Sequence, residues 1–384
     1  MKSFFTVLLI WLVGLGAAAQ FAKLGVPFSS VRELYPDAGS HVGWLLSLVS
    51  LIGVLFGMVA GMLVARYGYV RLMVLALTLG ALMSFWQATL PGFELMLLSR
   101  LFEGISHLMI VVAAPTLIAQ LSSDRYRGMA MALWSTFFGV SYALMAWLGL
   151  PFADHYGLAR LFVVHGLYML VLAGAVALFI RPIHESPGQP GDGVHLGAIL
   201  KRHVDAYRSA GIAAPAVGWF FYTFTFVSLL AILPQMLPAE SRNAVAGLMP
   251  LASIAVALLA VSGLLLVMRA TSIVTIGFFA ASAFLLLSFS GLSLPIICVG
   301  LFAVLGLVQG ATFAAVPQLN QSADNRALAN GAIAQMGNLG NLLGTPILLA
   351  IQNSIGNKGM LITIMLLYVV GGSAHLFLAR MRAR

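Results

Sequence analysis

Twelve apolar stretches, each about as long as one membrane-spanning helix, follow one another through the 384-residue chain. A helix needs about 20 apolar residues to cross the hydrocarbon core of a bilayer. The stretches are 4–22, 42–64, 71–90, 94–119, 128–151, 160–180, 212–236, 244–268, 271–290, 294–317, 328–352 and 359–379. Only 8% of the residues are charged, whereas soluble domains carry about 25% charge. The chain is therefore a polytopic membrane protein, which excludes a soluble enzyme, a disordered tail and a disulfide-stabilised secreted domain.

The longest polar stretch, residues 181–209, divides the chain near its middle. It begins with a Pro/Gly-rich sequence typical of a linker. We therefore predict an all-α membrane protein with two six-helix bundles, residues 1–180 and 210–384, joined by a cytoplasmic linker at 181–209.

The two predicted bundles repeat short motifs at an offset of roughly 200 residues. Glu103-Gly104 in the fourth stretch matches Gln309-Gly310 in the tenth. Two further matches are Gly61…Arg66 with Gly263…Arg269, and Asp124…Gly128 with Asp324…Gly331. Three matches in the same order indicate a duplication. Duplicated six-helix halves with a substrate site near the membrane midplane are typical of secondary transporters.

The first stretch has a second interpretation. Lys2, the apolar run and the small residues at 16–20 are also typical of a signal peptide and its cleavage site. Cleavage would leave eleven spans and remove the six-plus-six arrangement, so we expect the stretch to be retained as the first helix.

The basic residues indicate the orientation of the chain, because cytoplasmic loops are enriched in lysine and arginine. With both termini in the cytoplasm, fourteen of the twenty basic residues lie in cytoplasmic segments and five, including Lys23, on the opposite face. Arg100 alone lies inside a span. The formal net charge of +9 is therefore a topology signal, and we expect no nucleic-acid partner. The short loops favour a bacterial inner membrane.

Three motifs resemble the major facilitator superfamily. The loop after the second stretch reads Gly61-Met-Leu-Val-Ala-Arg66-Tyr-Gly68-Tyr-Val-Arg71 and resembles the family's loop between spans 2 and 3. Arg100-Leu-Phe-Glu103-Gly104 is similar to its span-4 motif, Arg-x-x-x-Gly, and the segment 124–128 to its approach to span 5. The resemblance covers the whole chain and implies twelve transmembrane helices in two six-helix pseudo-repeats.

The resemblance also implies a cytoplasmic gate loop formed by Gly61, Arg66, Gly68 and Arg71. Ala65 stands where the family has an acidic residue, which argues against a gate ion pair there. The drug antiporters of this family carry a dense Gly-Pro-Gly-Gly pattern in span 5. The glycines and proline at 139, 149 and 151 are too sparse to match it, which favours uptake over drug efflux.

Three ionisable residues in the fourth stretch are candidates for proton coupling. Arg100, Glu103 and His107 are spaced i, i+3 and i+7, which places them on one face of a helix. In one interpretation Glu103 binds and releases a proton, and Arg100 balances it or holds an anionic substrate. In the other, Arg100 and Glu103 form an intrahelical ion pair that only neutralises itself. His107 has an equally plain alternative as a neutral, hydrogen-bonded histidine.

Five further polar residues are candidates for binding substrate, together with Arg100. Tyr222 lies in the aromatic run of the seventh stretch, Gln309 in the tenth, Asn338 and Asn341 in the eleventh, and Gln20 in the first. Each has an alternative role in helix packing, since interhelical hydrogen bonds also explain buried amides. We interpret His165 and His375, isolated in the sixth and twelfth stretches, as packing residues.

We expect a secondary active transporter that moves a small organic solute by alternating access, with protons as the coupling ion and uptake as the direction. Proton-antiport efflux and a non-transporting sensor or assembly factor remain alternatives. The chain lacks the His-Glu-x-x-His, Gly-x-Ser-x-Gly and phosphate-loop motifs, so neither those enzymes nor ATP drive is expected. With one cysteine, Cys298, we expect no metal site and no cofactor. The expected state is a monomer in the lipid bilayer.

Overall fold

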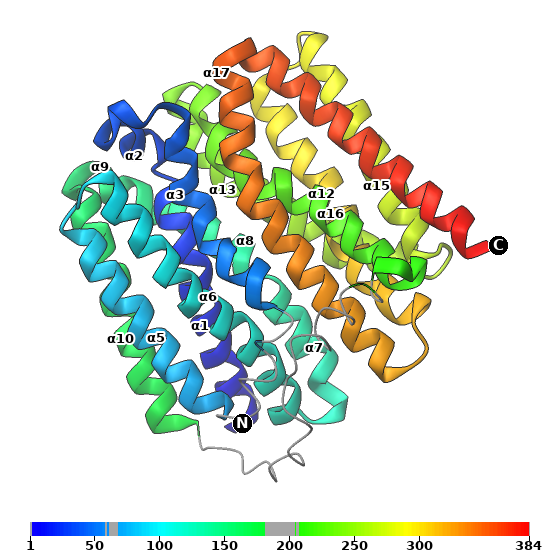
Figure 1. Ribbon diagram of the computed structural model, residues 1–384, viewed down its shortest axis with the longest axis horizontal. Helices are drawn as coiled ribbons and strands as arrows, with labels where there is room; N and C mark the ends of the chain where they lie inside the picture. The colour runs from blue at the N-terminus through cyan, green and yellow to red at the C-terminus, as the bar shows by residue number, and fades with distance from the viewer. Residues whose placement is uncertain (1, 58–59, 61–67, 181–203, 205–206, 384) are drawn as a thin grey trace. The chain divides into compact units, whose positions relative to one another are not determined.

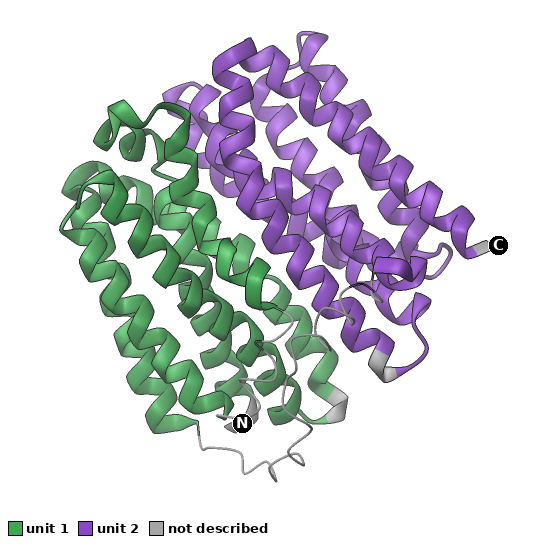
Figure 2. Cartoon of the chain, viewed as in Figure 1, with its two compact units in different colours: residues 1–187 green, residues 188–384 purple. Residues whose placement is uncertain are grey.

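The computed structural model describes residues 2–57, 60, 68–180, 204 and 207–383, and every regular element among them is a helix (Figure 1). The chain divides into two compact units, Met1–Pro187 and Gly188–Arg384 (Figure 2). Their boundary falls inside 181–209, the predicted linker, most of which lies outside the described residues. The prediction of an all-α membrane protein is confirmed.

Among the residues that the structure describes, the first unit has four long helices and several shorter ones. Its elements are α1 (Lys2–Gly25), α2 (Phe28–Leu34), η1 (Pro36–Gly43), α3 (Trp44–Ser47), η2 (Leu48–Ser50), α5 (Tyr69–Ala88), α6 (Phe93–Leu121), α7 (Asp124–Ser135), α8 (Phe137–Leu144), η3 (Met145–Gly149), α9 (Leu150–Tyr156) and α10 (Leu158–Phe179). Helix α1 packs against α6, α8 and α10, and α5 packs against α6 and α10 (Figure 1). This arrangement lets α1, α5, α6 and α10 place side chains at one common point.

The second unit has the same kind of construction. Its elements are α12 (Ala210–Ile232), η4 (Leu233–Met236), α13 (Ala239–Ala255), η5 (Val256–Ala260), α14 (Val261–Leu264), α15 (Ala270–Leu286), η6 (Leu287–Phe289), α16 (Leu294–Leu319) and α17 (Ala323–Ala383). Helix α12 packs against α16 and α17, and α13 packs against α16.

Eleven helical segments among the described residues are long and apolar enough to span a membrane. The last of them, Asn325–Arg382, is two helices joined at Gly356, where φ is +74°. A straight helix of the 61 residues of α17 would be about 90 Å long, three times the hydrocarbon thickness of about 30 Å. The two parts of α17 correspond to the predicted stretches 328–352 and 359–379.

Two glycines with matching contacts support the internal repeat. A Cβ atom on Gly104 of α6 would lie 2.4 Å from the carbonyl oxygen of Val49. A Cβ atom on Gly310 of α16 would lie 2.8 Å from the carbonyl oxygen of Ala257. Since both distances are far inside van der Waals contact, each helix needs a glycine at this point to approach its neighbour.

The predicted gate loop is only partly described. Gly61 and Arg66 lie outside the described residues. Gly68 directly precedes α5 with φ +89°, a conformation that favours glycine, and Arg71 is exposed in the first turn of that helix. The gating role of these residues stays a prediction.

Candidate functional site

Three charged side chains meet inside the first unit: Lys23 of α1, and Arg100 and Glu103 of α6. We call them the ion cluster. Lys23 Nζ lies 2.7 Å from Glu103 Oε1, Arg100 pairs with Glu103 Oε2, and all three side chains are 0% exposed. The contact between Arg100 and Glu103 belongs to one of the two interpretations that the sequence left open, and the second cation, Lys23, was missed.

The assignment of Lys23 to an outer loop was wrong. Helix α1 continues to Gly25, so Lys23 lies inside the helix and not after it. The apolar stretch ended at Ala22 because lysine is polar, but a helix ends where its backbone hydrogen bonds end. Lys23 can remain inside because a carboxylate of α6 neutralises it.

Glu103 is held by donors from three helices. Besides Lys23 and Arg100, Gln87 of α5 donates from Nε2 to Glu103 Oε2 at 2.8 Å. Three N–H donors around one buried carboxylate favour its ionised form. Glu103 thus joins α6 to both α1 and α5.

The guanidinium of Arg100 is occupied on all three nitrogens. Nε donates to the carbonyl oxygen of Leu45 and Nη2 to that of Gln20, each at 2.7 Å, while Nη1 donates to Glu103. Arg100 thus ties α6 to α1 and α3. Three of its five N–H donors are used, and because the side chain is 0% exposed, an anionic substrate reaches it only if the surrounding helices rearrange.

His165 is part of this site and not an isolated packing residue. Its Nδ1 lies 2.6 Å from Ser84 Oγ and 3.4 Å from Lys23 Nζ. Lys23 Nζ is itself 2.5 Å from Ser84 Oγ. The histidine is 142 residues from Lys23 in the chain, and no local pattern in the sequence signals their contact.

His107 lies on the same helix but makes a different contact. Its Nδ1 is 3.1 Å from the carbonyl oxygen of Ala17, and its ring packs edge-on against Phe21 at 5.0 Å between centroids. Because a carbonyl can only accept, Nδ1 carries the proton. A role for His107 in proton coupling stays a prediction.

Gln20 lies one turn before Lys23 on α1. Its Nε2 donates to Ser106 Oγ at 2.9 Å, and its side-chain Oε1 is buried with no hydrogen-bond partner in the described part of the chain. Gln20 is 0% exposed. Its main contribution here is the backbone carbonyl that Arg100 binds.

The second unit brings together two of the predicted substrate-binding residues, Tyr222 of α12 and Gln309 of α16. The Tyr222 hydroxyl donates to Gln309 Oε1 at 3.1 Å, and Ser253 of α13 donates to the same oxygen at 2.7 Å. The Tyr222 ring stacks between Trp219 and Phe226, with centroids 4.7 and 4.9 Å away. We call Tyr222, Ser253 and Gln309 the neutral cluster.

The two asparagines of α17 are not bonded to the neutral cluster in the described structure. Asn338 Nδ2 donates within its own helix, to the carbonyl oxygen of Ala334 at 2.8 Å. Asn341 Oδ1 is buried and lacks a hydrogen-bond partner among the described residues. Substrate binding by either residue stays a prediction.

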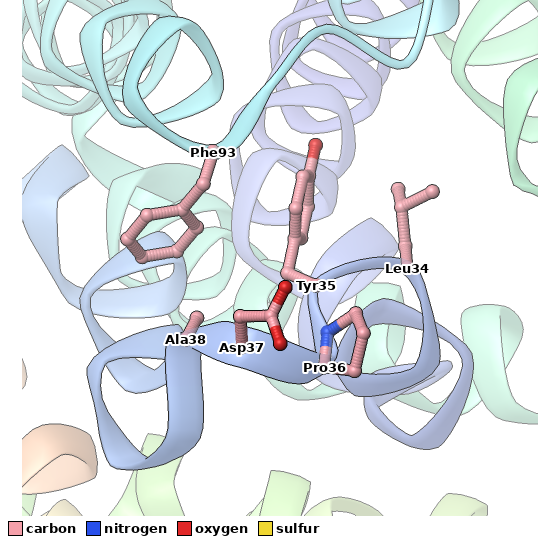
Figure 3. Close-up of a pocket in the computed structure, with 6 residues that line it drawn as sticks. All are labelled: Leu34, Tyr35, Pro36, Asp37, Ala38 and Phe93. Carbon is pink, nitrogen blue, oxygen red and sulfur yellow. The ribbon is translucent and has the colours of Figure 1, made fainter.

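A separate hollow of about 340 Å³ lies at the junction of α2, η1 and the start of α6. Figure 3 shows the rings of Tyr35 and Phe93 beside the carboxylate of Asp37. The Tyr35 hydroxyl donates to the carbonyl oxygen of Pro91 at 2.7 Å, and burial raises the pKa of this hydroxyl to about 12. The hollow shares no residue with the ion cluster, and sequence patterns did not point to it.

The comparisons with known proteins agree with this architecture. The sequence profile of the Major Facilitator Superfamily matches residues 3–345. The 3-(3-hydroxy-phenyl)propionate transporter of Escherichia coli (strain K12) is 28% identical over 359 residues, which cover 88% of this chain and 84% of that protein. The class G tetracycline resistance protein of Vibrio anguillarum is 28% identical over 243 residues, which cover 60% of this chain and 57% of that protein.

Proposed function

The chain belongs to the major facilitator superfamily, and we propose that it is a secondary active transporter that takes up a small organic solute together with protons. It is a multi-pass membrane protein. Duplicated helix bundles support a mechanism in which the substrate site opens alternately to the two sides of the membrane. The observation that carries the proposal is the ion cluster.

Buried charges need a reason inside a membrane bundle. Each costs about 2.5–3.5 kcal/mol on insertion scales. Arg100 and Glu103 would be sufficient as a self-neutralising pair, but Lys23 adds a second cation to one carboxylate. A purely structural role does not explain this excess cation. A coupling site, in which charge is gained and lost during transport, does explain it.

The first solute class to test is an organic carboxylate. An anion would neutralise the excess positive charge of the ion cluster, and the Escherichia coli relative is described as a transporter of an aryl propionate. Carboxylate binding at the ion cluster requires that the buried Arg100 become accessible to the solute.

Uptake of labelled 3-(3-hydroxyphenyl)propionate into proteoliposomes tests the proposal. We expect an inward proton gradient, with the outside more acidic than the inside, to increase accumulation of the labelled solute compared with proteoliposomes that have no gradient. Accumulation should also exceed that in protein-free liposomes, which control for permeation of the neutral acid. Glu103→Gln should remove this dependence, whereas Glu94→Gln, at an exposed acid in the first turn of the same helix, should retain it. Uptake equal to that of protein-free liposomes in both conditions would contradict the proposal for this solute class.

Proton-antiport efflux is the second candidate, favoured by the similarity to a tetracycline resistance protein. The two directions respond differently in a host that lacks its own efflux pumps. Efflux predicts increased resistance to tetracycline on expression of this chain, and uptake of a carboxylate predicts no change in resistance.

We also propose a location in the bacterial cytoplasmic membrane with both termini in the cytoplasm. With Lys23 removed from the outer loops, fourteen basic residues remain on the proposed cytoplasmic side against four on the other. A fluorescent protein fused to the carboxyl terminus should fluoresce, and alkaline phosphatase at the same position should be inactive. The opposite pair of results would reverse the orientation.

A further inference from the structure

The ion cluster carries one more positive than negative charge when its three members are ionised. Arg100 and Lys23 contribute two cations and Glu103 one anion, all of them fully buried. A net charge is costly in an apolar interior. The ion cluster is therefore stabilised by losing one proton or by gaining one anion.

Only one of the three groups is able to release that proton. A guanidinium is not deprotonated in proteins, and an ionised carboxylate has no proton to give. Protonating Glu103 instead would leave two buried cations without a counter-ion. Charge balance therefore points to the ammonium group of Lys23.

A hydrogen-bonded path leads from Lys23 to a histidine. Lys23 Nζ lies 2.5 Å from Ser84 Oγ, which lies 2.6 Å from His165 Nδ1. His165 Nε2 lies 3.0 Å from the carbonyl oxygen of Gly16. Since that oxygen can only accept, Nε2 holds the ring proton and Nδ1 presents a lone pair. The Ser84 hydroxyl is thus placed to accept from Lys23 while it donates to His165.

We propose that Lys23 carries the coupling proton and exchanges it with His165 through Ser84. In this step an N–H bond of the Lys23 ammonium breaks and its proton bonds to Ser84 Oγ, while the original hydroxyl proton of Ser84 bonds to His165 Nδ1. The products are a neutral amine, an unchanged hydroxyl and an imidazolium whose Nε2–H still faces Gly16. The total charge is unchanged, and one positive charge has moved from α1 to α10. This inference rests on the proposed proton coupling and names the groups that perform it.

The groups that face Lys23 accommodate both of its protonation states. From α6, Glu103 pairs with Arg100, so that this pair is neutral whether or not the lysine keeps its proton. From α10, the ring of Phe162 lies 5.6 Å from Nζ, a separation at which an aromatic face attracts a cation. The ammonium has favourable neighbours, and the amine leaves a balanced ion pair behind.

Three other titratable side chains face α1 from helices packed against it, and one of them, Tyr168 of α10, donates its hydroxyl to the carbonyl oxygen of Leu12 at 2.8 Å. His107 of α6 directs Nδ1 at Ala17. The hydroxyl of Tyr142, on α8, lies beside Gly25, where it has no hydrogen-bond partner among the described residues. None of the three side chains is hydrogen-bonded to Lys23 or His165 in the described structure, so all three stand outside the relay.

Nitrogen NMR of the full chain in lipid nanodiscs tests the relay without any solute. Isotope-labelled lysine and histidine report on four lysines and eight histidines, and Lys23→Gln and His165→Asn assign the two signals of interest. We expect the signals of Lys23 Nζ and His165 Nδ1 to shift over the same pH range, because both atoms report on one shared proton. In Ser84→Ala the two signals should shift over different pH ranges. Ser141→Ala is the matched control, because it removes another buried serine that is bonded to α1, at the Leu15 carbonyl oxygen, and should leave the two signals coupled.

An NMR result would overturn the relay if Lys23 stays an ammonium beside a neutral His165 at every pH at which the protein is folded. Unchanged coupling in Ser84→Ala would also overturn the path through the hydroxyl. Both readouts are independent of whether 3-(3-hydroxyphenyl)propionate is the right solute.

Flux measurements separate the relay from the proposed function. Lys23→Arg keeps a positive charge but cannot release a proton. We expect this variant to exchange internal unlabelled for external labelled 3-(3-hydroxyphenyl)propionate and to lose the accumulation driven by a pH gradient. A Lys23→Arg variant that accumulates the probe as wild type does would overturn the relay and leave the proposed function standing. A wild-type protein with no flux in either assay would contradict the proposed function for this solute class, while NMR still decides the relay.

Discussion

The ion cluster of the first unit and the neutral cluster of the second occupy matching places in the repeat but differ in charge. Glu103 of α6 meets Lys23 of α1 at 2.7 Å, and its counterpart Gln309 of α16 meets Tyr222 of α12 at 3.1 Å. An amide is satisfied by hydroxyl donors, whereas a buried carboxylate requires cations. The duplication has therefore preserved a contact between two helices while its chemistry diverged.

A second difference lies one helical turn earlier. Arg100 precedes Glu103 by three residues, and Gly306 precedes Gln309 by the same spacing. Arg100 reaches the carbonyl oxygen of Leu45, whereas a Cβ atom on Gly306 would already lie 2.4 Å from the carbonyl oxygen of Ser253. The first unit uses a long cation to join its helices where the second uses direct backbone contact. Proton coupling, as proposed, would then belong to the first unit alone.

The largest effect on stability is expected for Glu103→Gln, which places in the first unit the residue type that the second unit has at the matching position, Gln309. Two buried cations would lose the carboxylate that pairs with both of them, so the free energy of unfolding should fall by about 3–5 kcal/mol. Denaturant unfolding in detergent micelles measures this. A loss below 1 kcal/mol would show that the two clusters are interchangeable and that the charges of the ion cluster are not interdependent.

Gly306→Ala tests whether the second unit has room for any side chain where the first has Arg100. The added methyl group would press on the Ser253 backbone, and overpacking of this kind costs about 1–3 kcal/mol. Gly263→Ala is the control, because a Cβ atom there meets no other atom within 4 Å. Equal unfolding midpoints for the two variants would argue against the tight α13–α16 contact.

Lys23→Gln should have a smaller effect on stability than Glu103→Gln, although both change the same cluster. The variant leaves Arg100 and Glu103 as a balanced pair, so the hydrogen bonds lost are offset by removal of the excess charge. We expect the free energy of unfolding to change by no more than about 1 kcal/mol. A loss as large as that of Glu103→Gln would mean that Lys23 is needed for folding and would weaken its assignment as an exchangeable cation.

Tyr222→Phe should have the smallest effect. It removes one neutral hydrogen bond while Ser253 continues to donate to Gln309. Interhelical hydrogen bonds in membranes average about 0.6 kcal/mol, so the thermal midpoint should shift only slightly. A change comparable to that of Glu103→Gln would remove the energetic distinction between the neutral and the ion cluster.

The sequence predicted most of the described spans, because a run of apolar residues is a local property, although the stretch 128–151 starts within α7, before the span Phe137–Tyr156. The stretch 160–180 corresponds to Leu158–Phe179, and 294–317 corresponds to Leu294–Leu319. The pair of Arg100 and Glu103 was also predictable, since residues three apart on a helix touch. Lys23 was misplaced by the same reasoning, because its polarity was taken to mark the end of a span.

The sequence by itself determined the apolar stretches that are able to cross a membrane, and it placed Arg100 and Glu103 within reach of each other on one helix, since both depend on residues close together in the chain. Only the tertiary structure decided that this pair has a third member and a histidine beside it. Lys23 lies 80 residues from Glu103, and His165 lies 81 residues from Ser84. Such contacts form only when α1, α5, α6 and α10 pack together, because burial without water makes each charge depend on partners that other helices supply.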